Sequence, residues 1–167
     1  SYNNSYNNGV FSGYVEYPGD QAESYSLAIA PNGIIGNAYI GNSDGINDND
    51  VFYRFSTDNG VTWSNPQLIW DWNISTDSLG CLRGVSVVFG NNSEPYVAFN
   101  ISLLTETGFF PTLPSSIRVW SPGINGGVPK VIADQTNVPL FGNTGATTDA
   151  FLPVCRPAIG RSSTGSG

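Results

Sequence analysis

A set of short strand-like runs that recurs along the chain constrains the fold more than any other feature of the sequence. Alternating or uniformly apolar runs separated by turn residues are typical of β-strands. The runs are YSLAIA, GNAYIG, DVFYRFS, PQLIWD, GVSVVF, PYVAFN, SIRVWS and PKVIAD. Asn-Gly pairs such as Asn32-Gly33 and Asn59-Gly60 tolerate positive φ and favour hairpin turns between them. No convincing helical periodicity is present, so the sequence predicts an all-β protein.

The runs recur in sets of four. DVFYRFSTDNGVTWSNPQLIWD aligns with SSIRVWSPGINGGVPKVIAD, and LAIAPNGIIGNAYIG aligns with VVFGNNSEPYVAFN. The matched pairs are Arg54 with Arg118, Phe55 with Trp120, Ser56 with Ser121, Pro66 with Pro129 and Asp71 with Asp134. Each unit is therefore strand, turn, strand, loop, strand, turn, strand. Four strands in each repeat indicate a propeller blade or a related array.

A third unit begins near the end of the sequence. The segment CLRGVSVVFGNN is echoed by CRPAIGRSSTG, so that Arg83 corresponds to Arg156. We divide the chain into a polar arm with a first strand (1–20), two four-stranded units (21–83 and 84–155) and the start of a third unit (156–167). Because propellers need about four to eight blades, we expect this chain to form an incomplete ring.

One stretch of the first unit resembles a known family. In FSTDNGVTWSNP, the residues Ser56, Asp58, Gly60 and Trp63 match the S-x-D-x-G-x-x-W pattern of the Asp-box, or BNR repeat. The resemblance implies sialidase-like β-propeller blades of four antiparallel strands, with this hairpin at the outer edge of a blade. An aspartate in a turn accepts backbone N–H groups, glycine supplies positive φ, and tryptophan covers the turn. We therefore interpret the motif as structural.

The same resemblance suggests an anion-binding role for Arg83 and Arg156. First strands line the central channel of a propeller, and sialidase-like enzymes hold a carboxylate with an arginine cluster. Guanidinium groups bind carboxylates bidentately. The alternative is that each arginine pairs with a local acid or carbonyl. The family's Phe/Tyr-Arg-Ile-Pro stretch, tyrosine–glutamate pair and acid/base aspartate have no matching positions here, so we assign no catalytic residue and do not expect an enzyme.

Other residue groups suggest a cation site and a disulfide. The acidic loop GNSDGINDNDVF offers Asp44, Asp48 and Asp50 as oxygen ligands for calcium, although Asx side chains in such a loop also hydrogen-bond their own backbone. Cys81 and Cys155 lie near the starts of successive units and are predicted to form a disulfide. The alternative is two buried thiols.

Charge and composition exclude several function classes. The formal charge is −7 with six basic residues, so nucleic-acid binding is not expected. The chain has no histidine, which excludes Ser-His and Cys-His catalysis within it. No apolar run is long enough to span a bilayer.

Sequons at Asn3, Asn73, Asn91 and Asn100 indicate an extracellular or cell-surface glycoprotein, unless an Asn/Ser-rich chain contains them by chance.

Three functions fit these observations. The first is a non-catalytic extracellular binding or adhesion module, with glycans as candidate ligands and the remaining blades of the same or neighbouring chains as partners. Aromatic side chains such as Trp70, Trp72 and Tyr96 are candidates for stacking on sugars, or else pack in the core. The second is a fragment of a sialidase-like glycoside hydrolase. The third is a structural subunit of an extracellular fibre or surface layer, held by open sheet edges.

Overall fold

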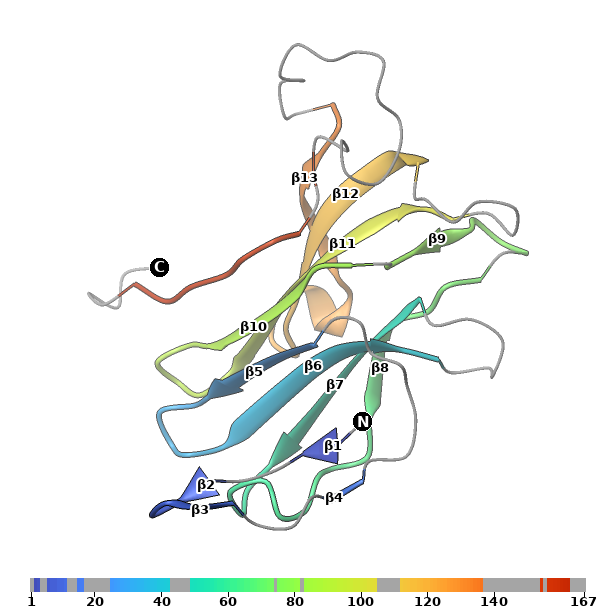
Figure 1. Ribbon diagram of the computed structural model, residues 1–167. Helices are drawn as coiled ribbons and strands as arrows, with labels where there is room; N and C mark the ends of the chain where they lie inside the picture. Colours follow the sequence, from blue (N-terminus) through green and yellow to red (C-terminus); the bar gives the residue numbers. More distant parts are fainter. Residues whose placement is uncertain are drawn as a thin grey trace.

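The protein is built from antiparallel β-sheets, as the strand-like runs predict (Figure 1). The computed structural model describes residues 2–3, 6–11, 15–16, 25–42, 49–73, 75–81, 83–104, 112–136, 154 and 156–162. Within these residues, the one helical element is a short 3-10 turn, η1 (Asn125–Gly127). No helix in the described part of the chain is long and apolar enough to cross a membrane.

The first sheet is a four-stranded antiparallel meander. Its strands follow the chain in order: β5 (Tyr25–Ile29), β6 (Ile35–Gly41), β7 (Asp50–Ser56) and β8 (Gln67–Trp70). All four lie where the sequence places a strand. Among its described residues, the polar arm has two short strand pairs in addition, β1 (Tyr2–Asn3) with β4 (Val15–Glu16) and β2 (Tyr6–Asn7) with β3 (Val10–Phe11).

The second sheet repeats the meander and adds a strand. Its strands are β10 (Val85–Phe89), β11 (Pro95–Leu103), β12 (Thr112–Trp120) and β13 (Lys130–Asp134), and β9 (Leu79–Gly80) also pairs with β11. β11 and β12 extend beyond the predicted runs, and β9 pairs with the end of the longer β11 through Gly80 and Ser102. β9 thus belongs to the second sheet, although its residues fall within 21–83.

Corresponding turns join the first two strands of each sheet. In both turns a backbone N–H donates to the carbonyl four residues on, and an asparagine oxygen accepts the N–H two residues on. The bonds are Ala30 N to Ile34 O (2.8 Å), Gly90 N to Glu94 O (2.9 Å), Ile34 N to Asn32 Oδ1 (3.2 Å) and Glu94 N to Asn92 Oδ1 (3.1 Å). The turn needs positive φ at its fourth residue, which Gly33 (88°) and Ser93 (63°) supply. The two sheets therefore begin with the same turn from different residues.

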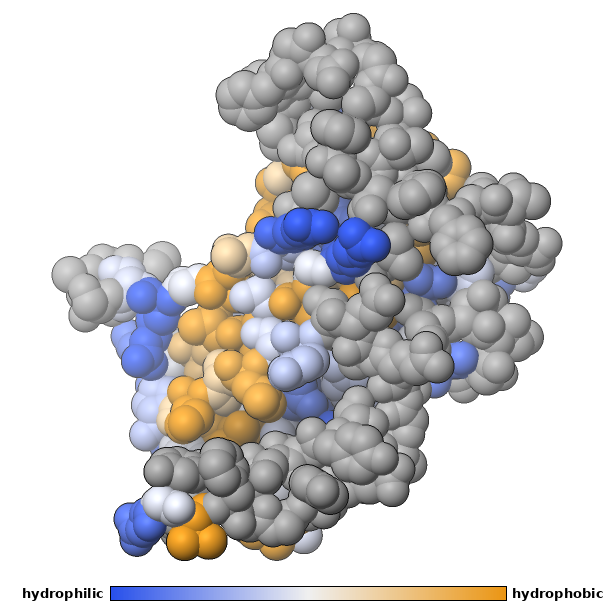
Figure 2. Space-filling view, in the orientation of Figure 1, coloured by the Kyte–Doolittle hydropathy of each residue, from blue (hydrophilic) through white to orange (hydrophobic). Residues whose placement is uncertain are grey.

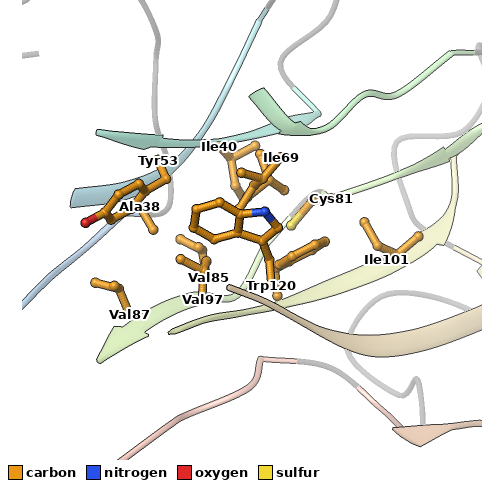
Figure 3. Packing of buried hydrophobic residues seen from close by; sticks show 12 residues of the cluster. Ala38, Ile40, Tyr53, Ile69, Cys81, Val85, Val87, Val97, Ile101 and Trp120 are labelled. Carbon is orange, nitrogen blue, oxygen red and sulfur yellow. The ribbon is translucent and has the colours of Figure 1, made fainter. Parts of the chain in front are cut away.

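The core lies between the two sheets, which pack face to face (Figure 3). Trp120 of β12 is almost fully buried there, and its ring lies 5.5 Å from that of Tyr53 on β7. Gly36 allows a close approach, because a Cβ at this position would lie 2.6 Å from Cζ of Phe89. The cluster draws on both sheets and contains Ala38, Ile40, Val51, Tyr53, Ile69, Cys81, Val85, Val87, Val97, Phe99, Ile101 and Trp120.

β5, β10 and the segment 156–162 are linked in turn by the same kind of hydrogen bond. The Val87 N–H at β10 donates to Ser26 Oγ on β5 at 3.1 Å, and the Ile159 N–H donates to Ser86 Oγ on β10 at 3.3 Å. The segment 156–162 thus lies beside β10, much as β10 lies beside β5. In each case a serine side chain accepts a backbone N–H of the next segment.

Candidate functional site

The hairpin between β7 and β8, here the Ser56 hairpin (residues 55–64), uses its polar side chains on its own backbone. The Ser56 hydroxyl donates to Asp58 Oδ1 at 2.8 Å and accepts the Gly60 N–H at 2.8 Å. The Thr62 N–H and hydroxyl both donate to Asp58, at 2.8 and 2.6 Å. Asn59 and Gly60 both have positive φ, 60° and 86°.

These bonds favour the ionised form of Asp58. Hydrogen bonds from the Thr62 side chain, the Thr62 backbone and the Ser56 hydroxyl lower the pKa of Asp58 to about 2. An ionised carboxylate can accept all of them at once, which stabilises the turn. The geometry gives Asp58 a local structural role.

Among the described residues, Arg54 and Arg118 are stacked on aromatic rings. The Arg54 guanidinium lies 5.1 Å from the Tyr39 ring centre and 5.0 Å from that of Trp63, so Trp63 covers the strand that leads into the Ser56 hairpin. The Arg118 guanidinium lies 4.4 Å from the Trp70 ring centre. Burial lowers the pKa of Arg118, against an opposing effect of the Asp77 charge. Alignment pairs these two arginines, but sequence reasoning gave them no role. Cation–π stacking accounts for both.

The second sheet has a matching turn, here the Ser121 turn (residues 120–129), without an aspartate. Gly123 stands two residues after Ser121, where the first hairpin has Asp58. The carboxylate comes instead from Glu94, in the turn between β10 and β11. Glu94 Oε1 accepts the Ser121 hydroxyl at 2.6 Å and the Gly123 N–H at 2.7 Å. Sequence reasoning did not find Glu94, because the motif pattern does not extend outside one hairpin.

Arg83 and Arg156 come from adjacent segments. A Cβ on Gly84 would lie 2.6 Å from the Arg156 Cα, so the two backbones touch at the starts of β10 and of the 156–162 segment. The Arg156 side chain is exposed and that of Arg83 is half-buried.

The predicted disulfide is not seen. Cys81 is a buried free cysteine whose Sγ lies 3.9 Å from the Arg83 carbonyl oxygen, and Cys155 is outside the described residues. Burial raises the pKa of the Cys81 thiol to about 12. Cys81 is part of the core between the sheets.

Three aspartates are predicted to bind calcium. Asp44 and Asp48 are outside the described residues, and Asp50 is within them. Asp50 is buried, and its Oδ1 accepts the Trp72 N–H at 2.7 Å. Among the described residues, no group of three or more His, Cys, Asp or Glu side chains is arranged to hold a metal ion. Asp50 therefore has a structural partner of its own.

The four sequons lie in different environments. Asn73 and Asn91 are exposed, whereas the Asn3 side chain is outside the described residues. Asn100 is buried, and its Nδ2 donates to Ser115 Oγ (3.1 Å) and to the Val154 carbonyl (3.0 Å). An amide held in this way does not fit a glycosylation site. Instead it ties the second sheet to Val154, a role that sequence reasoning missed.

The candidate sugar-stacking aromatics take part in packing. Trp72 is buried. Trp70 Nε1 donates to the Leu79 carbonyl at 2.7 Å, and its ring centre lies 6.3 Å from that of Phe99. The Tyr96 hydroxyl lies 3.5 Å from Glu94 Oε2.

Comparison of the chain with protein-family models and with curated proteins finds no match.

Proposed function

We propose that this chain forms blades of an Asp-box β-propeller and acts as an extracellular, non-catalytic module that binds acidic glycans. The observation that carries the proposal is a contact that repeats, from β5 to β10 and from β10 to the segment 156–162. Ser26 accepts the Val87 N–H, and Ser86 accepts the Ile159 N–H. A contact that repeats from unit to unit is what a radial stack of equivalent sheets requires.

The internal bonding of the Ser56 hairpin supports the same architecture. It joins the third and fourth strands of a four-stranded sheet, as the Asp-box does in the family that the sequence resembles. Its serine and aspartate bond within the turn, so they are not available to a ligand.

The binding role rests on the arginines at the starts of successive first strands. The Arg83–Gly84 backbone contacts Arg156, and the Arg156 side chain is exposed. A chain of net charge −7 repels most anions, so a local pair of cations is the feature that would select a carboxylate-bearing sugar. Repetition of one arginine per unit would build such a pocket around the axis of a ring.

The test is binding of sialylated and neutral oligosaccharides, measured by calorimetry and on a glycan array. We expect binding of the acidic glycans and a loss of at least about tenfold for Arg156→Ala, since a charge-assisted contact is worth about 1.5–3 kcal/mol. Lys130→Ala is the matched control, because it removes an exposed cation from β13.

Absence of binding, or equal losses in the two variants, would contradict the proposal. Turnover of a fluorogenic sialoside would favour the glycoside-hydrolase alternative instead.

A further inference from the structure

The first strand of the first sheet carries an uncovered apolar stripe. Tyr25, Leu27 and Ile29 alternate along β5 and are 66%, 51% and 72% exposed. They pair across β6 with Tyr39, Asn37 and Ile35. Figure 2 shows apolar surface gathered over the region of β5 and β10. The next strand on this face is much less exposed, since Asn37 and Tyr39 are buried. The open part of the face is thus its first strand.

The second sheet shows what covers such a stripe. Val85, Val87 and Phe89 alternate along β10 as the three residues do along β5, yet they are only 7%, 6% and 3% exposed. The first sheet covers them, with β5 and β10 packed together. β5 presents Ser26 and Ala28 on its covering side, and Ser26 binds the Val87 N–H. The apolar stripe of β10 therefore packs against the small side chains of β5.

The chain presents a similar small-residue surface elsewhere. In the segment 156–162, the Ile159 N–H binds Ser86, which places Ile159 in the role that Val87 has at β5. Its neighbours Ala158 and Gly160 are exposed, and alternation assigns them to the opposite side, the side that Ser26 and Ala28 occupy on β5. A Cβ on Gly160 would meet nothing within 4 Å. One chain thus offers a large apolar stripe on β5 and an exposed small-residue surface on the segment 156–162.

We propose that Tyr25, Leu27 and Ile29 of one copy of this chain dock against Ala158 and Gly160 of a second copy. The contact continues from chain to chain the sheet stacking that exists inside each chain. It joins two different surfaces, so it is heterologous and builds a ring if the rotation closes, or a filament if it does not. By the same alternation Arg156 lies on the side of Ala158 and Gly160, so the contact borders this proposed glycan-binding arginine, but it requires no ligand.

The experiment measures the mass of the 167-residue chain by light scattering over a wide concentration range. We expect assemblies larger than the 17.8 kDa monomer at high concentration. Leu27→Asp and Ala158→Glu each remove one of the two surfaces, and each variant alone is expected to be shifted strongly towards the monomer. Ile132→Asp is the matched control, because it places the same charge at an exposed apolar position of β13. Circular dichroism checks that every variant keeps its β-structure, and Leu27→Ser replaces Leu27→Asp if that variant unfolds.

Mixing the two defective variants gives the sharpest readout. Each retains the surface that the other lacks, so an equimolar mixture is expected to form dimers and nothing larger. A wild-type chain that stays monomeric at all concentrations would overturn the proposal. So would assembly that survives both substitutions, or a mixture that forms no dimer.

Discussion

In both the Ser56 hairpin and the Ser121 turn a serine hydroxyl donates to a carboxylate, but the two carboxylates come from different parts of the chain. Ser56 donates to Asp58, two residues along the chain, at 2.8 Å. Ser121 donates to Glu94, 27 residues earlier in the chain, at 2.6 Å. Each carboxylate also accepts a backbone N–H from the same turn as the serine: Asp58 accepts that of Thr62, and Glu94 accepts that of Gly123.

The two sheets differ at two corresponding positions, and the carboxylate stands at a different one of the two in each sheet. The first sheet has Asp58 in the hairpin and Ile34 in the turn between its first two strands. The second has Gly123 and Glu94 at the corresponding positions. A Cβ at position 123 would overlap Glu94 Oε1, so the absence of a side chain there makes room for the carboxylate. A buried serine hydroxyl needs an acceptor, and the sequence position of that acceptor is free to change.

The largest expected difference between the two regions concerns the residue before each serine. Trp120 is almost fully buried between the sheets, whereas Phe55 is 41% exposed. We expect Trp120→Ala to lower the free energy of unfolding by about 3–5 kcal/mol, the usual cost of truncating a large core aromatic. Phe55→Ala is the matched control and should cost much less. Urea denaturation followed by circular dichroism measures both, and equal losses would show that the two positions are packed alike.

The features that the sequence predicts correctly are the local ones. The strand Asp50–Ser56 and its partners follow from alternation and from turn residues a few positions apart. The Ser56 hairpin can be predicted from the sequence for the same reason, since Ser56, Asp58 and Gly60 lie within one turn.

The features that the sequence misses depend on contacts between distant segments. Glu94 meets Ser121 because two turns of one sheet lie side by side, which no local pattern encodes. Asn100 matches a sequon, yet its side chain is buried against Val154, 54 residues later. The strand Leu79–Gly80 is two residues long and forms only because β11 extends far enough to pair with it.

A smaller difference is expected between the two serines. The Ser56 hydroxyl accepts the Gly60 N–H and donates to Asp58, whereas the Ser121 hydroxyl donates to Glu94. We expect Ser56→Ala to cost about 1–2 kcal/mol of unfolding free energy and Ser121→Ala about 1 kcal/mol, at roughly 0.5–1.5 kcal/mol for each net hydrogen bond. Thermal and urea unfolding of both variants test this order. A larger cost at Ser121 would mean that the distant carboxylate forms the stronger turn.

The steric match between Gly123 and Glu94 is tested by a double-mutant cycle. Gly123→Ala should push the Glu94 carboxylate away from Ser121 and from the position 123 N–H, at a cost of about 1–2 kcal/mol for the two lost bonds. In a Glu94→Ala background the same change should cost little, because no carboxylate remains to be displaced. The urea midpoints of the four proteins give the coupling. Additive effects would show that Gly123 is required for a reason unrelated to Glu94.

The smallest expected effect is a difference in the acid response of the two carboxylates. Hydrogen bonds hold the pKa of Asp58 at about 2, below its ordinary 3.8, and those from Ser121, Asn92 and Gly123 lower the pKa of Glu94 from 4.5. A depressed folded-state pKa gives stability that is complete above the unfolded-state pKa and is lost as pH falls towards the folded-state value. The Glu94 contribution should therefore begin to decline at a higher pH than that of Asp58.

Melting temperatures recorded from about pH 6 to about pH 2 for the wild type, Asp58→Asn and Glu94→Gln measure this, because each variant lacks one titrating group. Glu94→Gln should reduce the fall in melting temperature in the upper part of this pH range, and Asp58→Asn should reduce it in the lower part. Acid limbs that run parallel in all three proteins would mean that neither carboxylate gains stability from its charge, and that the two turns are held by shape alone.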